Sequence, residues 1–415
     1  MKADTYTETG VPVVRGTNIS DTRAWKGDWV FIPEKLADSM NRCVVFAGDL
    51  VLPHRGSIGE VAIIPDDERG RYFISSSLMK ITLDRQKVDP LFCYYFLRSA
   101  EGRVEILRFS SSVGTPGIGQ PLTSLRQFRV PVPPLPEQRA IAATLGALDD
   151  KIELNRRMNA TLESMARALF RDWFVDFSPT RAKMEGREPY LSPDLWSLFP
   201  DRLDDEGKPE GWEVSTIGDE VRVVGGSTPS TKEPAFWDGG INWATPKDLS
   251  THSAPVLLET ARTITEAGLA KISSGLLPVG ALLLSSRAPI GYLAIAEVPV
   301  AINQGFIGMI CDRRISNVFT WLWTLENIEA IKAKANGSTF QEISKGNFRP
   351  LPVIVPPTPV LQAFDTVAKP LYERIAKNER ASRTLARTRD LLLPRLMSGE
   401  LRLSEIDQDE PEPAA

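Results

Sequence analysis

Cysteine and histidine are scarce in this chain of 415 residues, which contains three cysteines and two histidines. The cysteines, Cys43, Cys93 and Cys311, are widely separated and odd in number, so a disulfide framework is not expected. Together with only two histidines, they cannot form a zinc site of standard spacing. The sequence therefore argues against both the disulfide-rich and the zinc-stabilised classes of protein.

Long apolar runs are also absent. No run reaches the roughly 18 residues that a membrane-spanning helix needs. The first ten residues, MKADTYTETG, lack the apolar core of a signal peptide, so we expect a cytoplasmic protein. The net charge of −4 argues against a protein that coats nucleic acid without sequence preference, but a local basic surface is compatible with a balanced total.

Catalytic motifs are missing as well. No GxxxxGK[ST] pattern occurs, so no phosphate-binding loop for ATP is predicted. The GTPGIG string at Gly114 is not followed by a helical pattern, which favours a loop over a nucleotide site. The acidic PDDERGR string at Pro65 lies between predicted strands and is interpreted as a solvated hairpin. His54 and His252 have no evident nucleophile partner, so no enzymatic activity is expected of this chain.

The most regular feature is a long amphipathic helix expected over residues 135–177. Its apolar residues recur in steps of three and four, with Asn155 at one seam position, which is typical of a helix packed along a partner helix. About 36 residues of helix would span roughly 54 Å, too long for the core of one small domain. The expected seam residues are Ile141, Leu145, Leu148, Ile152, Asn155, Met158, Leu162, Met165, Leu169 and Trp173.

A second helix of the same kind is expected over residues 358–396. A shift of 223 positions places five residues of the first seam on residues of the second, and each helix follows a proline-rich strand end. The five pairs are Leu148 with Leu371, Ile152 with Ile375, Asn155 with Asn378, Leu162 with Leu385 and Leu169 with Leu392. A buried pair of asparagines would fix the register, whereas exposed ones would only face water, and the sequence leaves both interpretations open. The expected seam residues here are Val360, Phe364, Val367, Leu371, Ile375, Asn378, Leu385, Leu392 and Leu396.

The segments ahead of the two helices correspond to each other in order. GINWATPKDLS at Gly240 matches GVPVVRGTNIS at Gly10, and a later match pairs Arg287 with Arg55. The sequence therefore predicts an internal tandem repeat of α+β class with two mixed α/β domains. The predicted parts are a first domain (1–134), the first helix (135–177), a connector (178–211), a second domain (212–357), the second helix (358–396) and an acidic, disordered tail (397–415).

The two copies differ at their start. About 25 residues of the second domain precede Gly240, whereas nine residues precede Gly10. We therefore expect the first domain to lack its opening strand and loop. Either the native start lies upstream, or this copy is truncated.

Polar loop residues in both domains indicate recognition. Arginine pairs with guanine, asparagine and glutamine pair with adenine, and serine, threonine and lysine contact phosphate. Any one of them can instead be an ordinary solvated loop residue, and the recurrence of Arg55 and Arg287 can also reflect a shared structural contact. The candidate DNA-binding residues are Arg15, Asn18, His54, Arg55, Ser76, Thr115 and Gln120 in the first domain and Thr228, Ser230, Lys232, Lys247, Ser286, Arg287, Asn303, Gln304, Thr339 and Gln341 in the second.

These features resemble the specificity subunit of type I restriction–modification systems. The resemblance is carried by PLPEQRAIAATLGALDDKIELNRRMNATLESMARALFRDWFVDF at the centre, by GGSTPSTKEPAFWDGGINWATPKDLS at the start of the second domain, and by LLLPRLMSGEL near the end. It covers the chain after about residue 8, and the short first domain departs from the family plan.

The resemblance implies a division of labour. Each domain would read one half of a split DNA target, and the two long helices would pack antiparallel as a coiled-coil spacer. The subunit would be non-catalytic and would dock two modification subunits, which bind S-adenosylmethionine and methylate adenine. Restriction subunits that use ATP and Mg would join the assembly.

Other classes of function remain open at this point. A stand-alone methyltransferase or nuclease is disfavoured by the missing cofactor and metal motifs. A coiled-coil scaffold that does not bind DNA is compatible with the near-neutral charge. A truncated subunit that reads one half-site would explain the short first domain.

Overall fold

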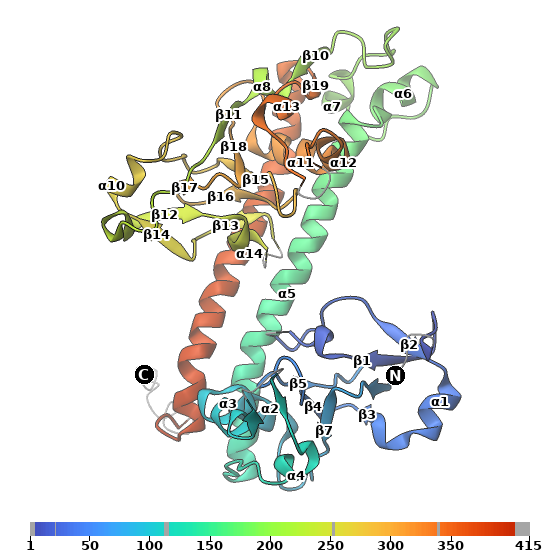
Figure 1. Cartoon of the computed structure of the whole chain (residues 1–415). Coiled ribbons are helices and arrows are strands. Elements are labelled where there is room, and N and C mark those ends of the chain that lie inside the picture. Colours follow the sequence, from blue (N-terminus) through green and yellow to red (C-terminus); the bar gives the residue numbers. More distant parts are fainter. Residues whose placement is uncertain (1–4, 21, 112–115, 251–253, 338–340, 403–415) are drawn as a thin grey trace, which may run out of the picture. The chain divides into compact units, whose positions relative to one another are not determined.

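The computed structural model describes residues 5–20, 22–111, 116–250, 254–337 and 341–402 (Figure 1). It divides into two compact units, one formed by Met1–Leu154 and Ser382–Ala415 and the other by Asn155–Ala381. Both divisions fall inside long helices, α5 (Leu135–Phe174) and α14 (Thr358–Met397), so each unit contains part of both helices.

The first unit contains the first repeat. One sheet has the order β2-β1-β6-β3, with β1 and β6 parallel, and a second has the order β5-β4-β7. The strands are β1 (Val11–Val14), β2 (Val30–Ile32), β3 (Val44–Phe46), β4 (Leu50–Pro53), β5 (Ala62–Ile63), β6 (Arg71–Ile74), β7 (Leu78–Ile81), β8 (Ser110–Ser111) and β9 (Gly117–Ile118). The shorter helices are α1 (Glu34–Ser39), α2 (Pro90–Arg98), α3 (Ala100–Leu107) and α4 (Pro121–Leu125).

Helix α2 begins at the expected Asp89-Pro90 signal. The Asp89 carboxylate accepts hydrogen bonds from the backbone amides of Leu91 and Phe92, and proline at the first helical position loses no needed donor. The helix buries Phe92–Leu97 in a core that also contains Leu145 of α5 and Leu396 of α14. The first repeat is therefore packed onto both long helices.

The second unit contains the second repeat. Its sheets have the orders β11-β18-β15-β16-β13, β14-β12-β17 and β10-β19. The strands are β10 (Glu213–Thr216), β11 (Arg222–Gly225), β12 (Trp237–Ala244), β13 (Val256–Leu257), β14 (Arg262–Ile264), β15 (Leu282–Ser285), β16 (Leu293–Ala296), β17 (Val300–Ile302), β18 (Phe306–Ile310) and β19 (Pro352–Val355). The shorter helices are α6 (Ser178–Met184), α7 (Pro193–Ser197), α8 (Ile217–Glu220), α9 (Pro246–Leu249), α10 (Glu266–Leu269), α11 (Asn317–Glu326), α12 (Ile328–Ala333) and α13 (Lys345–Phe348).

The two repeats share one topology. The parallel pair β1–β6 corresponds to β12–β17, and the antiparallel pair β4–β7 corresponds to β15–β18 with the same register. Two helices then follow in each copy, α2–α3 and α11–α12. The expected fold class, two repeated mixed α/β domains with two long antiparallel helices, is confirmed. In the described parts of residues 5–134, no element corresponds to β10, α8 or β11.

The long helices run antiparallel within each unit. In the second unit, Phe170 and Phe174 of α5 make edge-to-face contacts with Phe364 near the start of α14, while Asn159 bonds to Asn378 farther along. In the first unit, Asp149 of α5 bonds to Arg389 of α14. The residue numbers of the contacts decrease along α5 as they increase along α14, so the two helices run in opposite directions.

The seam asparagines are buried, so the interpretation that Asn155 and Asn378 face water is wrong. Their partners differ from a simple mutual pair. The Asn378 amide donates to Oδ1 of Asn159 at 2.9 Å, and the Asn155 amide donates to the Asn378 carbonyl oxygen at 3.4 Å. A satisfied polar contact at this point favours a single register, because a shifted helix would leave these groups unpaired.

Two other helix expectations need correction. Met165 and Val367 are exposed, and Ala166 and Ala368 occupy the buried positions beside them. A helix turns 3.6 residues per turn, so a stripe assigned by steps of three and four drifts off the contact face. Helix α5 ends at Phe174 rather than at 177, since Phe177 has a left-handed backbone with φ of 51°.

The three cysteines are free thiols. Burial raises the pKa of the Cys93 thiol to about 12 and that of Cys311 to about 11, so neither is an activated nucleophile. Among the described residues, no group of acidic, histidine and cysteine side chains is arranged to hold a metal ion. None of the helices in this part of the chain is long and apolar enough to span a membrane.

Candidate nucleic-acid interface

In the second repeat, polar loops meet at the carboxyl ends of β12 and β17. The two strands are parallel, so their carboxyl ends lie at one edge of the sheet. The β12 end leads to Lys247, and the β17 end leads to Asn303 and Gln304. A third loop joins them, because the backbone amide of Ser227 donates to the Ile302 carbonyl at 3.1 Å.

Further hydrogen bonds make these loops one surface. The Thr228 hydroxyl bonds to the Gln304 side chain, and the Asn303 side chain accepts from the Gly305 amide at 2.9 Å. The Ser286 amide donates to the Gly305 carbonyl at 2.8 Å, which brings the loop after β15 alongside. The candidate residues that are exposed on this surface are Thr228, Ser230, Lys232, Lys247, Gln304 and Gln341.

Arg287 lies on the same surface, in an isolated β-bridge with Glu342. Its guanidinium is 3.6 Å from the Glu342 carboxylate, and both side chains are almost half exposed, at 40% and 47%. An exposed pair of this kind contributes only about 0–1 kcal/mol. The guanidinium can therefore exchange this carboxylate for a phosphate or a base at little cost.

The first repeat builds the corresponding surface. The Ser75 amide donates to the Val14 carbonyl at 2.9 Å, so the loops after parallel strands β1 and β6 lie together. His54 Nε2 is 2.9 Å from the Ser76 carbonyl oxygen, and Arg55 forms a β-bridge with Gly117. The exposed or half-exposed candidates here are Arg15, His54, Arg55, Ser76 and Gln120.

The recurrence of Arg55 and Arg287 has a structural component. Each residue forms an isolated β-bridge to the segment just ahead of the last short helix of its repeat, Arg55 to Gly117 of β9 and Arg287 to Glu342. The two arginines therefore occupy the same backbone position in the shared fold of the repeats. The side chains stay accessible, since Arg55 is exposed and Arg287 is half-exposed.

Two of the candidate DNA-binding residues are buried and therefore do not lie on these surfaces. Asn18 is fully buried, and its amide donates to the carbonyls of Lys26 and Asp28 at 2.9 and 3.2 Å, so it holds the loop after β1 in shape. Ser286 is buried, and its backbone bonds to the loops at Gly305 and Ile343. Thr115 and Thr339 lie outside the described residues.

Aromatic side chains support both surfaces, which sequence reasoning missed. In the second repeat, the Arg262 guanidinium lies 3.6 Å from the ring centre of Trp237, and the Trp243 indole donates to the Ser227 carbonyl at 3.2 Å. In the first repeat, Arg69 lies 5.0 Å from the ring centre of Trp29. The paired tryptophans in each copy were the available signal, because arginine stacks readily on such rings.

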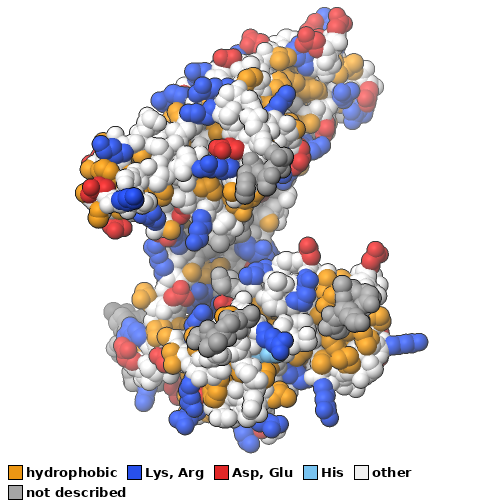
Figure 2. Space-filling view, viewed as in Figure 1, with side chains coloured by type: hydrophobic (Ala, Val, Ile, Leu, Met, Phe, Trp, Pro, Cys, Tyr) orange, Lys and Arg blue, Asp and Glu red, His pale blue; other side chains and the backbone are white. Residues whose placement is uncertain are grey.

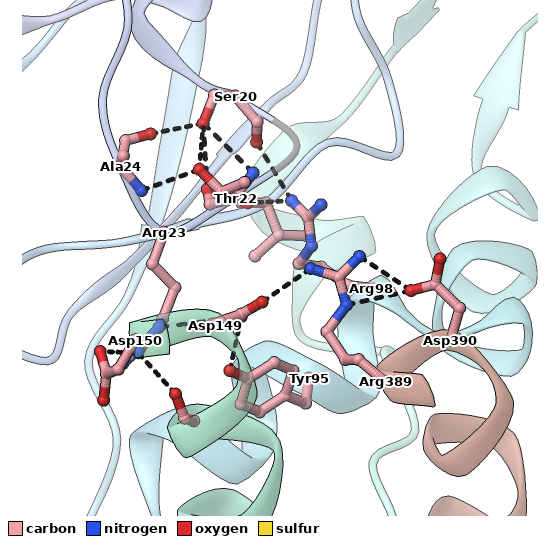
Figure 3. A network of polar contacts seen from close by, with 12 residues as sticks. Ser20, Thr22, Arg23, Ala24, Tyr95, Arg98, Asp149, Asp150, Arg389 and Asp390 are labelled. Atoms are coloured by element: carbon pink, nitrogen blue, oxygen red, sulfur yellow. Dashed lines mark hydrogen bonds and ion pairs between the residues drawn. The ribbon is translucent and has the colours of Figure 1, made fainter. Parts of the chain in front are cut away.

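A polar network fastens the first repeat to the long helices (Figure 3). The Tyr95 hydroxyl of α2 donates to Asp149 of α5 at 2.6 Å, and Arg389 of α14 donates to the same carboxylate at 2.7 Å. Arg23, in the loop after β1, pairs with Asp150 and donates to the Gly146 carbonyl at 3.1 Å. The loop that carries candidate residues is thereby held against α5, and α5 is in turn bonded to α14 through Asp149 and Arg389.

Charge is distributed over both repeats. Figure 2 shows lysine and arginine side chains spread over the viewed face of each repeat, with aspartate and glutamate side chains between them. The loop surface of the second repeat carries Lys232, Lys247 and Arg287. A few local cations suit contacts to phosphate at chosen points, and the overall charge of −4 does not favour indiscriminate binding.

The sequence profile described as the type I restriction modification DNA specificity domain matches residues 1–164 and 209–366. The chain belongs to this family. The two matched ranges include the two structural repeats, so each repeat is one copy of the specificity domain. The resemblance expected from the sequence is confirmed.

Similar proteins of this family come from several organisms. The chain is 26% identical over 381 residues to the type I restriction enzyme MjaIX specificity subunit of Methanocaldococcus jannaschii, covering 90% of this chain and 82% of that protein. It is 26% identical over 383 residues to the HindI specificity subunit of Haemophilus influenzae, covering 81% and 83%. The crystal structure of the type I S subunit from M. genitalium shares the fold, with a TM-score of 0.52 at 17% identity, covering 95% and 91%.

Proposed function

We propose that this chain is the DNA-reading subunit of a type I restriction–modification complex, with one specificity domain for each half of a bipartite target. The single observation that supports this most is the duplicated loop surface. Each copy gathers polar and cationic side chains from three or four loops at the carboxyl ends of two parallel strands. Such a surface offers donors and acceptors to base edges and cations to phosphates.

The proposal assigns the chemistry to partner subunits. Two modification subunits would bind S-adenosylmethionine and methylate adenine, and restriction subunits would use ATP and Mg. The relatives named above are specificity subunits of type I restriction enzymes, which supports a role in recognition for this chain. No catalytic role is proposed for any of its residues.

The test is to substitute Arg287 in the full complex. We expect Arg287→Ala to weaken methylation about tenfold or more through the half-site that the second repeat reads, because a lost arginine contact to a base costs about 1–3 kcal/mol. The other half-site should keep its sequence. Sequencing of methylated adenines across the genome, in cells that express the complex, reports both half-sites at once.

A matched control and a reciprocal variant sharpen this test. Arg222 is an exposed arginine that pairs with Asp312 at 2.9 Å on β11, outside the loop surface, so Arg222→Ala should leave both half-sites unchanged. Arg55→Ala should affect the opposite half-site from Arg287→Ala. Equal damage to both half-sites by either variant would refute the assignment of one domain to each half.

A further inference from the structure

Arg262 lies at the edge of the loop surface of the second repeat. It is the first residue of β14, and it pairs with Trp243 next to the carboxyl end of β12. The backbone amide of Ala261 donates to the Asp248 carboxylate at 2.7 Å, which ties this position to α9, the helix that carries Lys247. Since β14 is an edge strand of its sheet, Arg262 extends the loop surface on the side of β12 opposite to β17.

Two tryptophans hold the Arg262 guanidinium beside the loop that follows β11. Its central carbon lies 3.6 Å from the ring centre of Trp237 and 5.7 Å from that of Trp243. The Trp237 indole donates to the Ser230 carbonyl of this loop at 3.0 Å. The Trp243 indole donates to the Ser227 carbonyl of the same loop at 3.2 Å. Both tryptophans are buried, so the arginine and the loop share one rigid support.

The hydrogen-bond donors of this guanidinium are available to a ligand. A guanidinium that stacks on an aromatic ring uses its flat face, and its N–H groups point outward in its own plane. Arg262 is exposed, and within the part of the chain that the structure describes its side chain has no carboxylate partner. The nearby Asp248 carboxylate instead accepts from the backbone amides of Thr245 and Ala261, both at 2.7 Å.

The position of Arg262 favours a DNA phosphate over a base edge as its ligand. The loops at the ends of β12 and β17 form the middle of the surface, and Arg262 lies beside them on the edge strand. A duplex that offers its base edges to the middle presents its phosphates to the sides, because the backbones border each groove. A guanidinium can bind a phosphate through two parallel hydrogen bonds, and a stacked one loses little freedom when it does so.

We propose that Arg262 binds a backbone phosphate at the half-site that the second repeat reads, and that Trp237 is a positioning residue that holds the guanidinium flat for this contact. This role rests on the proposed function and adds to it a contact that fixes the domain on the duplex without reading bases. Arg262 then contributes affinity for any sequence, whereas Arg287 contributes the choice of bases.

The test measures DNA binding by the complete complex with its modification subunits, on a duplex that contains the methylated target, over a series of KCl concentrations. Each phosphate contact adds about 0.9 to the slope of the logarithm of the binding constant against that of the salt concentration. Arg262→Ala should reduce this slope by about one and weaken binding about tenfold. The loss should be the same on a duplex with altered bases in the half-site, and the methylated sequence should not change.

Further substitutions separate a phosphate contact from a purely structural role. Arg262→Gln keeps a planar group over the Trp237 ring but removes the charge, so its slope should match that of Arg262→Ala. Arg262→Lys keeps the charge and should restore the slope, with an intermediate affinity because lysine lacks the planar fork. Arg222→Ala is the matched control, since Arg222 is exposed on β11 outside the loop surface, and it should leave the slope unchanged.

An unreduced slope in Arg262→Gln would overturn the proposal, because the side chain would then only cover Trp237. A change of the bases in the methylated half-site in Arg262→Ala would also overturn it, since Arg262 would then read a base. Failure of the proposed function would appear in the unsubstituted complex, which would bind the target and a shuffled duplex equally.

Discussion

Buried polar side chains hold the long helices at chosen positions. Asn378 bonds to Asn159 in the second unit, and Arg389 bonds to Asp149 in the first. Such contacts add less stability than apolar packing, but they penalise a shifted register because an unpaired buried group costs about 1–3 kcal/mol. The effect belongs to single residues, although its result is the alignment of two helices.

The pH dependence of stability is predicted at this same scale. Burial raises the pKa of Glu163 on α5 above its ordinary value of 4.5, and the nearby Arg167 lowers it to a lesser extent. Since the folded protein binds this proton more tightly than the unfolded chain, the stabilising contribution is complete below pH 4.5. It is lost as the pH rises through the folded pKa.

Glu163→Gln should therefore raise the thermal midpoint of the second unit at pH 7, by an amount equivalent to no more than about 1 kcal/mol. At pH 4 and below, the variant and the parent should converge, because both then carry a neutral side chain. Calorimetry at several pH values measures the difference. A benefit that is equal at pH 4 and pH 7, or that the exposed Glu373→Gln control reproduces, would contradict this explanation.

At the scale of the elements, the two helices α5 and α14, of 40 residues each, contribute to both units. Helix α14 continues through Pro370 and Pro394, although a proline inside a helix removes a hydrogen bond and favours a break. Buried neighbours on both sides explain its persistence. Ala368 and Tyr372 pack in the core of the second unit, and Leu396 packs in the core of the first.

An insertion in both helices tests whether their length sets the spacing of the DNA target. Seven residues placed after Leu154 and seven after Ala381, at the boundaries between the units, keep the seam in phase and add about 10.5 Å of helix. That length equals about three base pairs. We expect the gap between half-sites to grow by about three, with unchanged bases at the ends, in the sequenced methylome.

A one-sided insertion provides the control for that experiment. Seven residues after Leu154 in α5 alone would lengthen one helix but not the other between the Asp149–Arg389 contact and the Asn159–Asn378 contact, so both contacts could not keep their register, and methylation should be abolished rather than the gap lengthened. An unchanged gap in the two-sided variant would show that the helices do not act as the ruler.

At the scale of the whole molecule, the first unit is assembled from both ends of the sequence. The described parts of residues 1–154 and 382–415 form this unit, and Leu396 is 2% exposed in the core of the first repeat. Arg389 neutralises Asp149, whose side chain is buried. The first repeat therefore depends on the last part of α14.

Truncation after Ala381 should unfold the first repeat and leave the second folded. The truncation removes Leu396, whose loss alone costs about 2–5 kcal/mol, and also removes the partly buried Leu392, Leu393 and Met397 from the same core. Asp149 loses its ion pair with Arg389 as well. Together these approach the whole stability of an ordinary domain. Limited proteolysis should degrade residues 5–134 rapidly, whereas deletion of residues 403–415 alone, which removes none of these side chains, should not. Resistance of the first repeat to cleavage after the longer truncation would contradict this dependence.

The sequence by itself determined the features that arise from local periodicity and from comparison of the chain with itself. Apolar spacing near 3.6 predicts α5 and α14, and the shift of 223 positions predicts their equivalence. The Asp89-Pro90 pair predicts the start of α2. The order of the elements and the family resemblance could be predicted from such patterns, because each pattern is made by residues that are close together in the chain.

Only the tertiary structure decided which polar residues are exposed and which residues pair across the fold. Asn18 and Gln304 are both polar loop residues in the sequence, yet one is buried and the other faces solvent. Asp149 and Arg389 are 240 positions apart, so no local pattern predicts their bond. The physical reason is that burial and pairing depend on distant segments that meet only after the chain has packed.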